Sequence, residues 1–163
     1  MVFVTLGSQK FQFNRLLKKI DELIEKEVIK EYVFAQIGSS DYKPKNYKYI
    51  DFIDADIFNE MSSKADIVIT HGGTGAIIGS VKKGKKVIAV PRLSKYGEHV
   101  DDHQIQLVEQ FDEMQIIKAC YDIEELKEVY VKIKKLELVP YESNTAKIIN
   151  SIDRYLLNER NKI

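Results

Sequence analysis

A glycine-rich turn in the middle of the chain is the strongest candidate for chemistry. Residues 66–79 begin as a β-branched run, break at Gly72-Gly73-Thr74-Gly75 and continue with helical spacing. A strand, a tight turn and a helix start together form an anion site, because the first helical N–H groups point outward and the helix dipole adds positive charge. Glycines let the backbone approach a phosphate without a Cβ in the way. We interpret this turn as a cradle for a diphosphate.

Two alternatives apply to the same turn. The glycines could serve only the tight connection between a strand and a helix, since such turns are common in α/β folds. A dinucleotide site is disfavoured, because Gly73, Gly75 and Gly79 are spaced G-x-G-x-x-x-G, one residue too long, and do not follow the first strand. A nucleotide-sugar epimerase or dehydrogenase is therefore a weak hypothesis.

His71 stands immediately before the glycines, at the mouth of the predicted central strand. Its imidazole could donate to a phosphate or stabilise a leaving group, which makes it the candidate catalytic residue. The alternative is a histidine that merely caps the strand. Gly7 and Ser8 follow the first strand and could supply further donors to the diphosphate.

A second polar block follows the next strand, over residues 92–104. Amide and carboxylate groups there suit sugar hydroxyls. The candidates for the sugar and ribose side are Arg92, Glu98, Asp102, His103 and Gln104. His99 and His103 could suggest a metal, but they lie four residues apart in a segment that starts as a loop, and no H-E-x-x-H pattern occurs. The sequence therefore predicts no metal and no cofactor.

The elements that must position these residues alternate along the chain. Short apolar runs predict strands at residues 2–6, 32–37, 49–52, 65–70, 86–90 and 115–119. Amphipathic segments between them predict helices, and the alternation implies a parallel sheet. The predicted fold class is α/β, with a single Rossmann-like parallel sheet and helices on both faces. Ligands of such sheets lie beyond the carboxyl ends of the strands, so the polar segments should converge on one cleft.

Helix starts and the last helix follow from local signals. Asn14 is expected to cap the first helix, and Asp101 with Gln104 has capping-box spacing. Residues 141–157 carry an apolar stripe after a proline and form the last helix of a domain over residues 1–157, with a frayed tail at 158–163. The stripe either packs on this domain's own sheet or docks a partner.

Composition limits the class of protein. The 163 residues fit one domain, and 25 basic residues balance 25 acidic ones, which argues against a nucleic-acid binder held by bulk charge. The single cysteine, Cys120, excludes an intrachain disulfide and fits a reducing compartment. No apolar run approaches membrane-spanning length. We expect a cytoplasmic protein, reaching a membrane only through a surface or a partner.

The motifs in their order suggest a family. The strings I-T-H-G-G-T-G, G-K-K-V-I-A-V-P-R and E-H-V-D-D-H-Q resemble the C-terminal domain of family 28 glycosyltransferases. The opening V-T-L-G-S, followed by Phe11 and Phe13, is similar to the start of their short, single-domain members. Those members include the small subunit of the split dolichol-pathway UDP-N-acetylglucosamine transferase and bacterial subunits for capsule and exopolysaccharide synthesis.

This resemblance implies the C-terminal, donor-binding half of a GT-B glycosyltransferase. Gly72 to Gly75 would then hold the diphosphate of a UDP-sugar, and Asp102, His103 and Gln104 would face the sugar. Many full-length members carry a ribose-binding glutamate on the helix after the glycines. Here that region reads Ile78-Gly79-Ser80, and Ser80 is a weak substitute.

The resemblance also implies a missing half. The acceptor domain would be a separate, membrane-anchored subunit that recruits this chain to the inner face of the membrane, where the acceptor is lipid-linked. The leading hypothesis is an inverting, UDP-sugar-dependent hexosyltransferase subunit that is active with its partner. The alternative from another class is a non-catalytic nucleotide-binding regulatory module.

Overall fold

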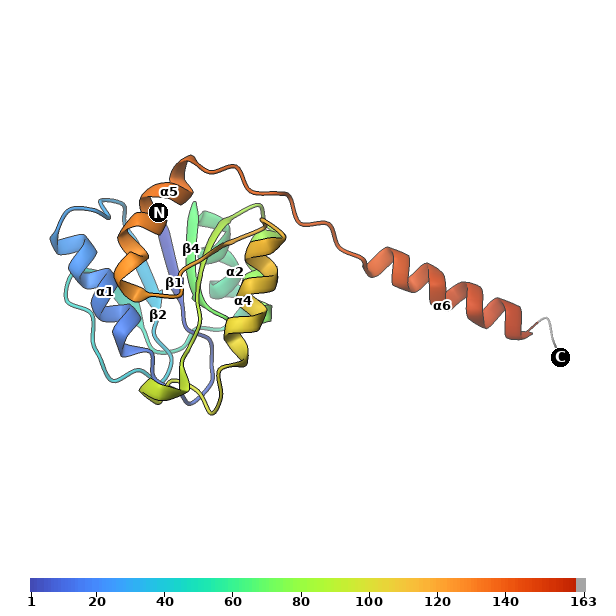
Figure 1. The fold of residues 1–163 in the computed structure, drawn as a ribbon, viewed down its shortest axis with the longest axis horizontal. Coiled ribbons are helices and arrows are strands. Elements are labelled where there is room, and N and C mark those ends of the chain that lie inside the picture. The colour runs from blue at the N-terminus through green and yellow to red at the C-terminus, as the bar shows by residue number, and fades with distance from the viewer. Residues whose placement is uncertain (161–163) are drawn as a thin grey trace.

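The protein forms a six-stranded parallel sheet covered by helices on both faces (Figure 1). The structure is a computed structural model that describes residues 1–160, with side chains to residue 155. The strands are β1 (Val2–Thr5), β2 (Val33–Gln36), β3 (Lys48–Ile50), β4 (Ile67–His71), β5 (Lys86–Val90) and β6 (Lys118–Ala119). The helices are α1 (Asn14–Glu25), α2 (Ala55–Lys64), α3 (Thr74–Val81), α4 (His103–Glu113), α5 (Leu126–Lys135) and α6 (Thr145–Arg160), with 3-10 turns η1 (Ser94–Tyr96) and η2 (Ile123–Glu125). The predicted α/β class is confirmed.

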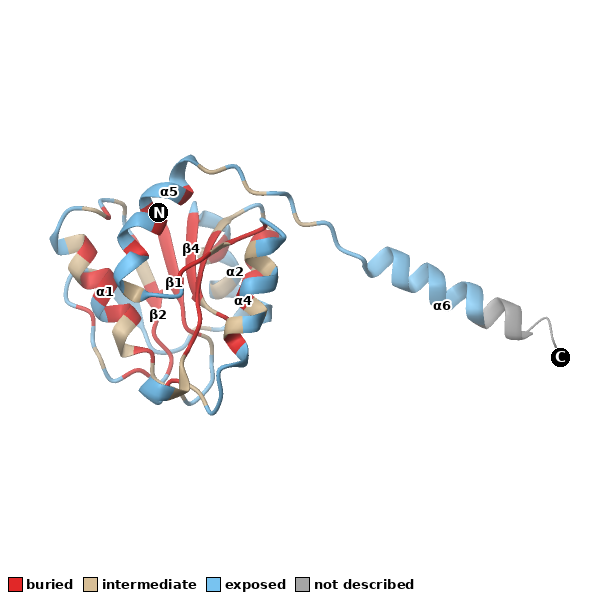
Figure 2. Cartoon of the chain, viewed as in Figure 1, coloured by how far each residue is buried: buried red, intermediate tan, exposed pale blue. Residues whose placement is uncertain are grey.

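Successive side chains of β1 point to opposite faces of the sheet, and the core therefore has two layers. Val2, Val4 and Leu6 pack with the buried residues of α1 and α5 on one face. Phe3 packs on the other face with Ile77 of α3 and Val108 of α4. Strands β1, β4 and β5 are buried almost throughout, as expected for central parallel strands (Figure 2).

The strand order places a switch point beside β1. The order across the sheet is β3-β2-β1-β4-β5-β6, so the chain builds outward from β1 in one direction and then in the other. Thr5 pairs with Thr70 on β4, which aligns the carboxyl ends of these two strands. Open α/β sheets bind ligands at this position, because the connecting loops separate there.

Two predicted helix caps are wrong. Phe13 occupies the N-cap of α1, while the Asn14 side chain accepts a hydrogen bond from the Tyr42 backbone at 3.0 Å. Asp102 occupies the N-cap of α4 without a side-chain cap bond, and Gln104 points into the protein instead of back to the helix start. Tertiary partners take the side chains of Asn14 and Gln104. Asp101 keeps a local role, because its Oδ1 accepts from the His103 N–H at 3.1 Å.

Helix α6 projects away from the sheet, and every side chain described on it is exposed (Figures 1 and 2). The alternative in which its stripe packs on this domain's own sheet is therefore wrong. The helix continues to Arg160, and the remainder of the predicted frayed tail, residues 161–163, lies outside the described residues. Within residues 1–160, none of the helices combines the length and the apolar character needed to cross a membrane.

Candidate functional site

The polar segments predicted to converge do lie together at the carboxyl edge of the sheet. Gly7 follows β1, Gly72 follows β4, and Arg92 comes just after β5. The His71 ring lies against Gly7, and the Gln104 side chain bonds the backbone of both Gly72 and Arg92. Three loops that are distant in sequence thus share one small polar region.

The imidazole of His71 lies between two glycines. A Cβ at Gly7 would come within 2.8 Å of His71 Cε1, and a Cβ at Gly73 would collide with His71 Nε2. Gly7 also has a φ of 72°, which side chains rarely adopt. Glycine at these two positions therefore makes room for the imidazole, whereas the sequence interpretation assigned the space at Gly73 to the ligand.

His71 is a neutral imidazole at physiological pH. Burial, reinforced by the charge of Arg92, lowers its pKa from 6.5 to about 4, while a hydrogen bond with the Thr5 backbone opposes the shift. Thr70 lies beside it, with Oγ1 3.4 Å from His71 Nδ1. A neutral ring can donate one N–H bond but brings no positive charge to a phosphate.

We expect acidification to lower the free energy of unfolding, because His71 resists protonation in the folded protein. Between pH 6.5 and about 4 the unfolded chain binds a proton that the folded protein does not, so stability falls as pH falls through this window. The loss reaches about 3 kcal/mol at most. Urea unfolding from pH 7 to pH 4 measures it, and His71→Gln should remove this part of the slope. A variant whose slope matched the wild type would contradict the assignment.

Gln104 joins two loops. Its Oε1 accepts from the Gly72 N–H at 3.0 Å and from the Arg92 N–H at 3.1 Å, and the residue is 3% exposed. A Cβ at Gly72 would lie 2.8 Å from Gln104 Cβ, so this glycine permits the close approach. The Gly72 N–H is thus occupied within the protein, and the side-chain oxygen of Gln104 is not free to accept from a sugar hydroxyl.

We expect Gln104→Ala to destabilise the fold. Removing Oε1 leaves two buried backbone N–H groups without an acceptor, at about 1–3 kcal/mol each. Denaturant unfolding should show this loss, and affinity for UDP and for a UDP-sugar should fall together because both loops move. Gln104→Glu keeps an accepting oxygen and is the matched control. A Gln104→Ala protein with the wild-type free energy of unfolding would show that the two hydrogen bonds do not contribute to stability.

The start of α3 offers backbone donors to solvent. Its N-cap residue is Gly73, which has no side chain to cap the helix. The first N–H groups of a helix have no partner within the helix. Thr74 and Gly75 are exposed, and a Cβ at Gly75 would meet nothing within 4 Å. Ser8, on the loop after β1, is exposed as well. Open space and free donors therefore coincide at this helix start.

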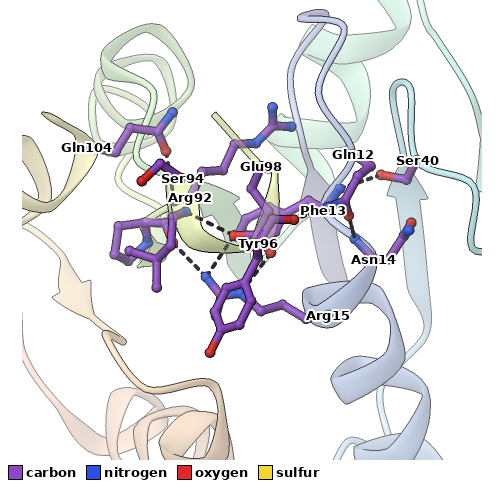
Figure 3. Close-up of polar contacts among 12 residues, drawn as sticks. Gln12, Phe13, Asn14, Arg15, Ser40, Arg92, Ser94, Tyr96, Glu98 and Gln104 are labelled. Carbon is purple, nitrogen blue, oxygen red and sulfur yellow. Dashed lines mark hydrogen bonds and ion pairs between the residues drawn. The ribbon is translucent and has the colours of Figure 1, made fainter. Parts of the chain in front are cut away.

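Glu98 is an internal anchor and not a rim residue (Figure 3). It is 1% exposed and forms an ion pair with Arg15, with Nε to Oε1 at 2.8 Å, while Oε2 accepts from the Leu93 N–H at 3.0 Å. Arg15 also donates to the Pro91 carbonyl at 2.8 Å. The predicted place of Glu98 beside a sugar is wrong, because its carboxylate ties the loop after β5 to the start of α1.

Arg92 is a buried cation beneath the site. It is 1% exposed, its Nη2 donates to the Leu6 carbonyl at 2.7 Å, and its guanidinium lies over the Phe13 ring (Figure 3). Nε and Nη1 have no hydrogen-bond partner among the described residues. Burial lowers its pKa to about 10, so it remains charged at neutral pH. An incompletely paired positive charge favours an anion nearby.

Asp102 and His103 are exposed at the start of α4, as the sequence predicted for rim residues. Asp102 Oδ1 accepts from the Ser94 N–H at 2.7 Å, which holds η1 in place. His103 contacts Asp101 through Nδ1. Possible ligand atoms of His99, Asp101 and His103 lie within 4.8 Å of one another, a proximity that their spacing in the sequence does not indicate.

Two structural features were missed by sequence reasoning. By its sequence pattern, Arg15 is an ordinary charged residue of an amphipathic helix. No local signal predicts its ion pair with Glu98, which lies 83 positions away. Ser80 was considered for ribose, yet it is fully buried and donates to the Ala76 carbonyl at 2.8 Å. Gly79, the residue before it, is half-buried and has open space at its Cβ position.

The fold is an open parallel α/β sheet with a glycine-rich helix start at its carboxyl edge, and comparison with solved structures agrees. The glycosyltransferase of kitacinnamycin superposes with a TM-score of 0.61 at 18% identity, covering 81% of this chain and 34% of that one. The solution structure of ALG13 superposes with a TM-score of 0.57 at 19% identity, covering 87% and 89%. These likenesses establish the fold, that of the C-terminal half of a GT-B glycosyltransferase.

The sequence establishes the family. The family model described as glycosyltransferase family 28 C-terminal domain matches residues 1–156, and the chain belongs to that family. A curated relative, the UDP-N-acetylglucosamine transferase subunit ALG13 of Candida glabrata, is 35% identical over 81 residues. The aligned region covers 49% of this chain and 39% of that protein.

Proposed function

We propose that this chain is the donor-binding subunit of a two-component glycosyltransferase. It binds a UDP-sugar and, with its partner, transfers the sugar to a lipid-linked acceptor in bacterial capsule or exopolysaccharide synthesis. The observation that carries the proposal is the uncapped start of α3, which faces open space at Gly75. Membership of the family and the word "subunit" in the name of the Candida glabrata relative support it.

In this proposal the diphosphate lies at the N-terminus of α3. The N–H groups of Gly73, Thr74 and Gly75 and the helix dipole stabilise its charge, and Gly7 and Ser8 lie alongside. Arg92 adds a buried positive charge from below. Asp102, His103 and the Nε2 of Gln104 face the sugar side, whereas Glu98 and Ser80 have no part because their polar atoms are engaged inside the protein.

The reaction would be direct displacement at the anomeric carbon. The departing UDP gains negative charge, which the backbone N–H groups at the start of α3 stabilise. His71 is left as a positioning residue, because the single N–H of its neutral ring is engaged by the Thr5 backbone. An inverting transfer also needs a base for the acceptor hydroxyl. His71, with a pKa of about 4, is a weak base, so we assign that base to the partner.

The partner would be a membrane-anchored, acceptor-binding subunit. A docking role for α6 is supported by its exposed apolar side chains, which are those of Ile148, Ile149, Ile152 and Tyr155. Such a partner would hold the chain at the cytoplasmic face of the membrane, beside its lipid-linked acceptor. The alternative is a non-catalytic nucleotide-binding regulatory module. It is favoured by the sequence of α3, which has Gly79 and Ser80 in the region where a carboxylate would bind ribose.

Calorimetric titration with UDP, UDP-sugars, UMP and NAD tests the proposal. We expect UDP and one UDP-sugar to bind, UMP to bind more weakly because it lacks the β-phosphate, and NAD not to bind. Binding of NAD without UDP would reject the proposal. Binding of a UDP-sugar without any transfer when the partner and acceptor are present would favour the regulatory module.

A further inference from the structure

Two histidines and an aspartate meet on the loop that leads into α4. His99 Nδ1 lies 3.3 Å from Asp101 Oδ1, and His103 Nδ1 contacts the same carboxylate oxygen. Possible ligand atoms of all three side chains lie within 4.8 Å of one another. The left-handed turn at Gly97, with a φ of 66°, precedes this segment and lets it fold back toward the helix start.

The arrangement is held in place before any ligand arrives. The His99 side chain is 8% exposed and packs against the Phe11 ring, with centroids 5.0 Å apart. The His103 ring meets it edge-on at 4.7 Å. Asp101 and His103 are open to solvent, at 58% and 48% exposed. The cluster therefore has one half-buried member, which the Phe11 ring orients, and two accessible ones.

The three side chains meet at one carboxylate oxygen. Asp101 Oδ1 accepts from the His103 N–H at 3.1 Å and contacts the Nδ1 atoms of both imidazoles. The Asp101 N–H lies 3.4 Å from His99 Nδ1. The cluster is therefore formed by contacts among its own members, and each neutral imidazole keeps one nitrogen that can act as a metal ligand.

We propose that His99, Asp101 and His103 bind one divalent transition-metal ion of the Zn²⁺ class. Two imidazoles and a carboxylate suit Zn²⁺, Co²⁺ or Ni²⁺, whereas Mg²⁺ and Ca²⁺ prefer oxygen ligands alone. Ligand atoms about 2.0–2.1 Å from a tetrahedral Zn²⁺ lie about 3.3 Å apart, which agrees with the 3.3 Å between His99 Nδ1 and Asp101 Oδ1. His103 Nδ1 contacts the same oxygen more closely, so the exposed His103 ring would turn away from it to bind the ion. Three protein ligands leave one coordination position for water.

The metal would fasten the loop that orients Gln104. His103 is followed directly by Gln104, whose side chain bonds the loops after β4 and β5. A metal at residues 99–103 therefore fixes the start of α4 relative to the candidate UDP site. This inference goes beyond the proposed function, because metal binding requires neither a UDP-sugar nor a partner.

Titration of the chelator-treated full-length protein with Co²⁺, followed by visible absorption and calorimetry, tests the proposal. We expect one Co²⁺ per chain, displaced by Zn²⁺, and affinity at least tenfold lower in Asp101→Asn and in His103→Gln. Asp102→Asn, which changes the adjacent carboxylate, is the matched control and should bind as the wild type does. Both test positions are exposed, so circular dichroism should show unchanged folding.

Absence of stoichiometric Co²⁺ binding would overturn the proposal. So would equal affinity of the wild type and Asp101→Asn, since the metal would then lie elsewhere. UDP titration of the same metal-free protein separates this outcome from the proposed function, because failure of metal binding leaves UDP binding to be measured on its own.

Discussion

Gly75→Val is expected to lower UDP affinity at least 100-fold while the protein stays folded. The new side chain would meet no protein atom within 4 Å of its Cβ, so nothing in the fold opposes it. It would instead occupy the open space in front of the first turn of α3, where the diphosphate is proposed to lie. A 100-fold loss corresponds to about 2.7 kcal/mol of binding free energy. Calorimetric titration with UDP measures the effect.

The size and position of the side chain provide the controls. Gly75→Ala adds one methyl group and should cost less affinity than Gly75→Val. Gly73→Ala should also reduce stability, because its Cβ collides with the His71 ring. Only position 75 therefore separates binding from folding. A folded Gly75→Val protein with wild-type UDP affinity would remove the diphosphate from this helix.

Deletion of residues 143–163 is expected to abolish capture by the acceptor-binding partner and leave the domain intact. Ile148, Ile149, Ile152 and Tyr155 are 52–65% exposed, so their removal sacrifices no core packing. The deletion begins beyond Tyr141, which still packs against the core. We expect unfolding free energy within about 0.5 kcal/mol of the full chain, unchanged UDP affinity, and loss of co-purification with the partner.

Point variants on the two faces of α6 refine this result. Ile149→Asp and Ile152→Asp place a charge on the apolar stripe and should prevent partner binding. Asn150→Asp adds the same charge on the opposite face of the helix and should not. A truncated protein that remained folded and still captured the partner would exclude α6 as the docking element. Aggregation of the truncated protein would instead contradict the exposed position of the helix.

Periodicity was sufficient to predict the architecture. β-Branched runs and amphipathic spacing are local properties, and they indicated the parallel sheet, the helices on both faces and the edge of the sheet that carries the polar loops. The glycine turn was placed correctly at a helix start. The reason for each glycine was not local, however, since Gly73 accommodates the His71 ring and Gly72 accommodates Gln104.

The side-chain partners of the site could not be read from the sequence. Glu98 and Arg15 are 83 positions apart, and only the fold brings them together as a buried ion pair. Gln104 resembled a capping residue because of its spacing from Asp101, yet its amide bonds two other loops. The proximity of His99, Asp101 and His103 is likewise absent from their linear spacing, because it depends on the path of the loop before α4.

The central claim, that the N-terminus of α3 holds the diphosphate, is tested most directly by amide NMR. ¹⁵N-labelled protein is titrated with UDP and, separately, with uridine. We predict that UDP shifts the Gly73, Thr74, Gly75 and Ala76 amides, whereas uridine, which lacks phosphate, leaves them nearly unchanged. Saturating UDP that left these four amides unmoved would contradict the account.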